Sequence, residues 1–186
     1  MNLFPVQHWK DVAKQNIDRL NDNKTAEEYF DINDFKELLW YTYQKVYEYV
    51  YLDDFVRYVC LSAISRADSD WPLSLVDFRS VLELQIKETF KDLVQKYIDK
   101  KNYSLANIVR ELEANKMITG DMAFAMHQIR ISGNAATHQL KTFDYDDNNY
   151  CWDDFNEDDS ENLNYLLKIL KFFNTYNKEH NIQFPK

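Results

Sequence analysis

The stretch MHQIRISGNAATHQL (residues 126–140) has the apolar spacing of an amphipathic helix and contains one of only two glycines in the chain. Together with Met122 just before it, its apolar positions recur every three or four residues and form one stripe: Met122, Met126, Ile129, Gly133, Ala136 and Leu140. A glycine inside a helix costs about 1 kcal/mol relative to alanine. Gly133 is therefore expected where another backbone approaches the helix closely, or where the helix kinks.

Polar side chains share one flank of this helix beside the apolar stripe. With about 100° between successive residues, this flank contains His127, Arg130, Asn134 and His138. Arginine presents a fixed fork of donors to phosphate or carboxylate, and histidine titrates near neutrality. The flank is thus a candidate for recognition, for catalysis or for the binding of a small ligand.

The composition predicts an all-α fold. Hydrophobic residues make up 45% of the 186 residues, whereas glycine occurs 2 times and proline 3 times. Folds rich in strands need many tight turns, and such turns consume glycine and proline. We expect a bundle of about five or six helices. No apolar run reaches the length of a membrane span, and Cys60 and Cys151 have no pattern of zinc ligands or paired disulfides, so the sequence suggests a cytoplasmic protein with no cofactor and no metal.

Helical spacing and capping residues place the expected helices along the chain. The segments are about 6–20, about 35–50 after a cap at Asn33 or Asp34, about 76–100, Ser104 to Asn115, a helix capped by Asp121, and a last helix capped by Asp159 or Ser160. The tyrosines of residues 41–51 alternate as in a strand, but no neighbouring segment offers a strand partner, so helix is favoured. The best candidate for a break is the stretch 65–74.

The negative charge of the chain is concentrated in one segment. The formal net charge is −9, and nine acidic residues lie between Asp144 and Glu161, so the other 22 acids (31 − 9) balance the 22 Lys and Arg. A balanced body has no broad basic surface for duplex DNA. The insert 144–161 fits a calcium loop poorly, because Asn149 and Phe155 replace the required Gly and Glu. We expect a solvated loop whose aromatic residues fold back, or alternatively a segment that docks on a basic partner.

Two stretches of the chain resemble a bacterial family of helical domains. They are FRSVLELQIKETF (78–90) and SLANIVRELEANKMITGDMAFAMHQIRISGNAATH (104–138). The family has a signature close to R-x-x-G-N-x-x-x-H, matched by Arg130, Gly133, Asn134 and His138, and an earlier arginine and glutamate matched by Arg79 and Glu83. Its members resemble HEPN (higher eukaryotes and prokaryotes nucleotide-binding) bundles and are often fused to restriction or other defence enzymes. The resemblance covers about residues 76–176.

The resemblance implies a HEPN-like domain over residues 71–186, preceded by a helical extension, 1–70, that packs on it. Its leading implication is an interaction module in a phage-defence or toxin–antitoxin setting, which forms a homodimer or binds a protein through the face of Arg130, Gly133, Asn134 and His138. In a structural role, Arg130 would pair with a buried acid such as Glu83.

Many HEPN proteins are metal-independent RNases that use an R-x(4 to 6)-H motif, so the alternative partner is RNA. His138 would then be the general acid or base, and Arg130 would stabilise the charge of the phosphorane. Seven residues separate the two here, and Ile131 follows the arginine where active members usually carry a polar residue. The interaction module is therefore favoured over the RNase.

Overall fold

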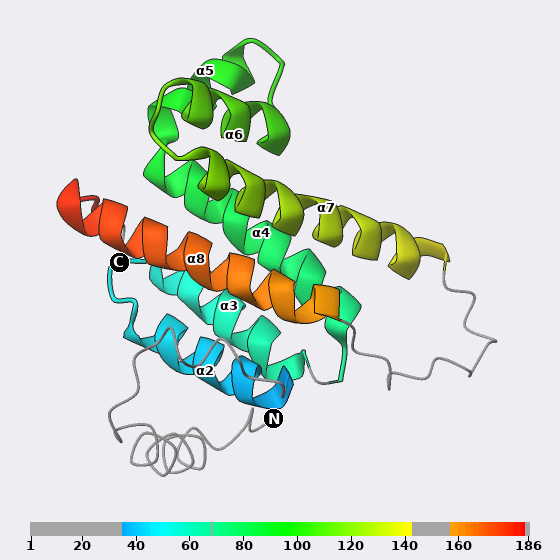
Figure 1. Cartoon of the computed structure of the whole chain (residues 1–186). Helices are drawn as coiled ribbons and strands as arrows, with labels where there is room; N and C mark the ends of the chain where they lie inside the picture. Colours follow the sequence, from blue (N-terminus) through cyan, green and yellow to red (C-terminus); the bar gives the residue numbers. More distant parts are fainter. Residues whose placement is uncertain (1–34, 68, 143–156, 185–186) are drawn as a thin grey trace.

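The computed structural model describes residues 35–67, 69–142 and 157–184, and these form seven helices with no strand among them (Figure 1). The helices are α2 (Phe35–Glu48), α3 (Asp54–Arg66), α4 (Trp71–Thr89), α5 (Lys91–Asp99), α6 (Leu105–Ala114), α7 (Gly120–Thr142) and α8 (Glu157–Glu179). The all-α prediction is confirmed. The expected helix at 6–20, the cap at Asn33 or Asp34 and most of the acidic segment lie outside the described residues.

One expected helix is divided into two, and α3 is a further helix that the sequence spacing did not place. The tyrosine-rich segment is helical, as predicted, but α2 ends at Glu48 and α3 begins after Asp53, whose carboxylate accepts hydrogen bonds from the N–H groups of Phe55 (2.9 Å) and Val56 (3.1 Å). The segment 76–100 is interrupted at Phe90, which leaves the helical conformation with φ −117° and ψ 47°. The Phe90 ring packs against two rings of α8, at 6.2 Å from Phe173 and 5.1 Å from Tyr176. Contacts distant in sequence therefore override the local helical period.

Capping side chains account for most of the remaining helix ends. The predicted break at 65–74 is confirmed: Asp70 caps α4 by accepting from the N–H of Leu73 (3.1 Å). Ser104 caps α6 and Asn115 ends it, as the sequence suggested. The start of α7 differs, because Thr119 rather than Asp121 accepts from the N–H of Met122 (3.2 Å). The last helix begins at Glu157, slightly before the expected Asp159 or Ser160.

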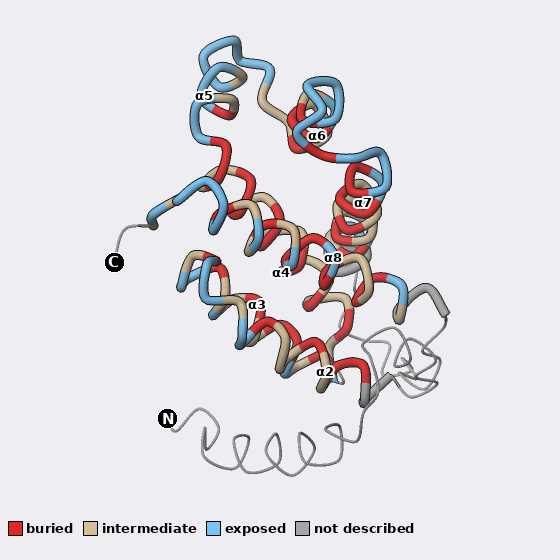
Figure 2. The backbone as a smooth tube through the Cα atoms, turned by 60° about the vertical axis from the view of Figure 1, so that its left-hand side comes forward, coloured by how far each residue is buried: buried red, intermediate tan, exposed pale blue. Residues whose placement is uncertain are grey.

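Helix α4 is the centre of the bundle and contacts α3, α5, α7 and α8. Helix α7 runs beside α4, α8 packs on both, and the α2–α3 hairpin closes the other side (Figure 1). Figure 2 shows α5 largely exposed at one end, whereas α4 and α7 have buried positions along their length. The largest fully buried side chains include Phe78, Leu82, Ile86, Met126, Ile129, Leu166, Leu170 and Phe173. Burying one such side chain stabilises the fold by about 1.5–3 kcal/mol.

A chain of buried polar groups connects α4, α8 and the turn between α2 and α3. Gln85 donates to the Thr89 hydroxyl (2.8 Å), and this hydroxyl donates to the amide oxygen of Asn177 (3.0 Å). The amide nitrogen of Asn177, a fully buried residue, donates to the carbonyl of Tyr51 (2.9 Å). These bonds fix the turn on the bundle, because a buried polar group left without a partner costs about 1–3 kcal/mol.

Neither glycine is used for a turn. The described non-glycine residues with positive φ are Lys101 (52°), Lys116 (57°) and Asn181 (51°), and no glycine has positive φ. Each of the three follows a helix C-terminus and closes it by paired backbone bonds; after α6, for example, Met117 N–H donates to Leu112 C=O and Lys116 N–H to Glu113 C=O, both at 2.9 Å. This is the arrangement that usually takes glycine.

Within the described ranges, no helix combines the length and apolarity that crossing a bilayer requires. Cys60 is a free thiol in the core, and burial raises its pKa, so it stays protonated at neutral pH. The other cysteine, Cys151, lies outside the described residues. The division of the chain near residue 70 stays a prediction; α3, on the N-terminal side of that boundary, packs along α4.

Candidate functional site

Helix α7 contains the four residues of the signature, which are Arg130, Gly133, Asn134 and His138. It is one uninterrupted helix from Gly120 to Thr142. The predicted apolar stripe is confirmed where side chains are described: Met122, Met126, Ile129, Gly133 and Ala136 are buried. The polar flank is less covered, since His127, Arg130 and Asn134 are half-buried and His138 is exposed. The fold therefore divides the signature into a buried glycine and accessible polar side chains.

Gly133 marks the closest approach of α7 to α4. A Cβ placed on Gly133 would lie 2.5 Å from the Cβ of Arg79 and 2.8 Å from the carbonyl oxygen of Leu75. Real Cβ atoms do not approach other heavy atoms so closely, so glycine is required at this point of contact. The predicted close approach is confirmed, and the approaching backbone belongs to α4 of the same chain.

Glu83 has three partners, and Arg130 is not one of them. Its carboxylate accepts from the Tyr103 hydroxyl (2.9 Å), pairs with Lys87 (2.9 Å) and lies 3.7 Å from an Arg79 guanidinium nitrogen. The expected pairing of Arg130 with Glu83 is thus wrong: one turn separates Arg79 from Glu83 on α4, so this partner is local and outcompetes a residue of another helix.

These partners also set the protonation of Glu83. Burial acts to raise the pKa of Glu83, but the hydrogen bonds from Lys87 and Tyr103 and the charges of Lys87 and Arg79 hold it below its ordinary value. The tyrosine responds in the opposite direction: burial, then the hydrogen bond to Glu83, raises the pKa of Tyr103. Glu83 is therefore an ionised structural carboxylate, and no general acid at neutral pH.

His127 and Arg130 are adjacent on α7, one turn apart. The ring Nδ1 of His127 and the Nε of Arg130 are both buried and have no hydrogen-bond partner among the described residues. Burial, followed by the positive charges of Arg130 and Arg110, lowers the pKa of His127, while Glu113 acts in the opposite direction. The ring is therefore neutral at pH 7.

Arg130 and His138 are not neighbours on α7 within a single chain. They are eight positions apart along the straight helix α7, which corresponds to about 12 Å between their Cα atoms. The structure shows no break at Gly133 that would shorten this distance. The histidine beside Arg130 is His127, which precedes it in the sequence.

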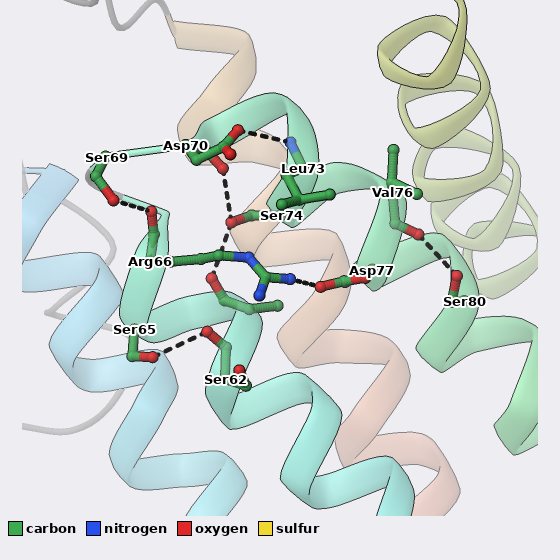
Figure 3. A network of polar contacts seen from close by, with 11 residues as sticks. Ser62, Ser65, Arg66, Ser69, Asp70, Leu73, Ser74, Val76, Asp77 and Ser80 are labelled. Atoms are coloured by element: carbon green, nitrogen blue, oxygen red, sulfur yellow. Dashed lines mark hydrogen bonds and ion pairs between the residues drawn. The ribbon is translucent and has the colours of Figure 1, made fainter. Parts of the chain in front are cut away.

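Sequence reasoning missed two clusters of charged side chains, one beside α7 and one at the start of α4. Arg110 and Glu113 come from α6, and the turn at 115–119 brings them beside His127. At the first turns of α4, Arg66 pairs with Asp77 across the break between α3 and α4 (Figure 3). There the Ser74 hydroxyl lies 2.9 Å from the carbonyl oxygen of Ala63 and 3.0 Å from that of Asp70. Apart from the local contact of Ser74 with Asp70, no spacing rule predicts these contacts, because they depend on how two helices pack.

Comparison with known proteins identifies one family. A family model described as "Domain of unknown function (DUF4145)" matches residues 62–170, which is more than half of the chain and extends from α3 to α8. No curated protein and no solved structure matches the chain.

Proposed function

The chain belongs to the DUF4145 family of domains of unknown function, and from the geometry of α7 we propose that it is a HEPN-like interaction module that pairs with a second copy of itself. The partner contacts the outer face of α7, because α4 already occupies the glycine stripe. The same proposal includes a bacterial setting in phage defence or toxin–antitoxin pairs, which rests on the resemblance alone. It also includes a cytoplasmic location, which rests on the unpatterned cysteines and the lack of an apolar run.

The observation that carries this proposal is the exposure of two large apolar side chains on α7. Phe124 is 53% exposed and Ile131 is 48% exposed. Residues seven apart lie on the same side of a helix, so both face outward, and the exposed His138 continues the row. Aligned apolar residues beside an arginine are typical of the centre of a protein interface.

The spacing of the signature suits a two-fold axis. Arg130 and His138 lie four residues before and four residues after Asn134. In an antiparallel pair of α7 helices whose two-fold axis passes through Asn134, Arg130 of one copy faces His138 of the other, and this happens twice. The same pairing brings the two Ile131 side chains into the contact.

Sedimentation velocity over a range of protein concentrations tests the self-association. We expect a dimer for the wild type and a monomer for Ile131→Glu, because the substitution places a charge in the contact. The matched control is Ile98→Glu, since Ile98 is 46% exposed and belongs to α5 and not to α7. A wild-type monomer at every concentration, or a dimer that Ile131→Glu leaves intact, would contradict the proposal.

The symmetric spacing also keeps a metal-independent RNase as the second candidate. Across the proposed dimer, Arg130 of one copy faces His138 of the other, so both could contact one phosphate, whereas within one chain their Cα atoms lie about 12 Å apart. The test is cleavage of total RNA in EDTA by the wild type, His138→Ala and, as control, His180→Ala at the exposed end of α8. Cleavage lost only in His138→Ala supports the RNase, and no cleavage by the wild type rejects it.

A further inference from the structure

We propose that the α6–α7 hairpin of a single chain contains a binding site for a phosphate group, formed by Arg110, His127 and Arg130. The site does not depend on self-association, because all three residues come from one copy. It differs from the pairing of Arg130 with His138, which needs two copies.

The salt bridges of the arginines distinguish Arg110 and Arg130 from the others. The part of the chain that the structure describes contains five arginines. Three have carboxylate partners: Arg57 with Asp54, Arg66 with Asp77, and Arg79 with Glu83.

The other two arginines, Arg110 and Arg130, form no salt bridge within the described ranges. The positive charges of both lower the pKa of the same histidine, His127. Unpaired positive charges that converge on one point attract an anion.

The hairpin geometry brings the three side chains together. Helices α6 and α7 pack on each other and are joined by the short turn 115–119, so they run antiparallel. This arrangement brings Arg110 alongside His127, and Arg130 follows one turn later on α7. Arg110 is exposed, whereas His127 and Arg130 are half-buried. The site is therefore open at one side, so that an anion attached to a larger molecule can enter.

Two buried nitrogen atoms at this site lack hydrogen-bond partners among the described residues. The Nε of Arg130 carries a hydrogen in its only charge state, and this atom is buried without a partner in the described residues. The ring Nδ1 of His127 is buried and unpaired as well, and it can donate to an anion in the tautomer that carries its hydrogen on Nδ1. Leaving such a group unsatisfied costs about 1–3 kcal/mol. Phosphate oxygens are strong acceptors, and the guanidinium fork of arginine matches their geometry.

The carboxylate whose charge reaches His127 is Glu113 on α6. Its Oε1 lies 3.4 Å from the position of a Cβ on Gly120, at the start of α7. Gly120 precedes His127 by about two turns, so this carboxylate borders the site on the side away from Arg130. Two guanidinium groups against one carboxylate leave the site with net positive charge.

Nuclear magnetic resonance of the histidine rings tests the site directly on the full chain. Sodium phosphate is titrated at constant pH against sodium chloride of equal ionic strength, with phenyl phosphate as a second probe to distinguish free phosphate from a phosphate ester. We expect a saturable shift of the His127 signals with phosphate and none with chloride. Arg110→Gln and Arg130→Gln should each weaken binding about tenfold or more, which is about 1.4 kcal/mol.

The control variant is Arg57→Gln, since Arg57 is paired with Asp54 on α3 and lies outside the hairpin. It should bind phosphate as the wild type does. The affinity for phosphate should also be the same at protein concentrations below and above those at which the chain self-associates, which separates this site from self-association. Equal responses to phosphate and chloride, or phosphate shifts that persist in both arginine variants, would overturn the proposal. A response to phenyl phosphate alone would assign the site to phosphate esters.

Discussion

Gly133 of α7 lies directly against Arg79 of α4: a Cβ on the glycine would be 2.5 Å from the Cβ of Arg79. The substitution Gly133→Ala should therefore push the two helices apart, although alanine is the better helix former. We expect the free energy of unfolding to fall by about 1–3 kcal/mol, as for other overpacked contacts. Urea denaturation monitored by circular dichroism measures it.

The control for this prediction is the only other glycine of the chain. Gly120 is also helical, but the nearest atom to its Cβ position is the flexible Glu113 carboxylate oxygen at 3.4 Å. Gly120→Ala should change stability by less than about 1 kcal/mol, and in the stabilising direction. Equal losses in both variants would mean that Gly133 is needed for a reason other than the contact with α4.

Lys116 provides a prediction of the opposite sign. It follows α6 with φ 57°, a conformation that costs a residue with a Cβ about 1–2 kcal/mol. Lys116→Gly should therefore raise the midpoint of thermal unfolding, with a stabilisation of about 1 kcal/mol. Lys171→Gly, at an exposed position inside α8, should lower stability by a similar amount. The same substitution then has opposite effects, and a loss at both positions would refute the argument.

The buried chain through Asn177 should be energetically important. Asn177→Ala leaves the Tyr51 carbonyl and the Thr89 hydroxyl without their partner, so we expect a loss of about 1–3 kcal/mol in chemical denaturation. Asn174 accepts from the Tyr51 N–H at an exposed position, where water can replace it. Asn174→Ala should thus cost about 1 kcal/mol or less. If the two variants were equally stable, the buried chain would not fix the turn.

The depressed pKa of His127 predicts how stability depends on pH. The unfolded chain takes up a proton at His127 near the ordinary pKa, about 6.5, whereas the folded chain does so only at lower pH. The contribution of His127 is therefore complete above about pH 6.5 and is lost as the pH falls toward the folded pKa. Urea midpoints at pH 7.5 and pH 5.5 should show this decline, and His127→Gln should reduce it. A decline of unchanged steepness in the variant would contradict the assignment.

Local signals in the sequence predicted what neighbouring residues determine. The scarcity of glycine and proline indicated helices, Ser104 and Asn115 marked the ends of α6, and the stretch 65–74 contained the break before α4. The glycine in an apolar stripe indicated a close helix contact, which the structure places against Arg79.

Features that depend on contacts between distant segments could not be predicted from periodicity. The interruption at Phe90 reflects its packing on α8, and Glu83 takes Arg79 rather than Arg130 as its arginine. Arg110 could not be identified from the sequence, because its closeness to His127 arises only when α6 and α7 fold back on each other.

The contact at Gly133 also sets the register of α7. If α7 slid along α4 by one turn in either direction, a residue with a Cβ, such as Ile129 or Thr137, would meet the Leu75 carbonyl. Sliding is thus blocked both ways, and the height of every α7 side chain relative to α4 is fixed. A change of shape that ligand or partner binding produces must therefore rotate α4 and α7 as one unit against their neighbours, and translation of one past the other is excluded.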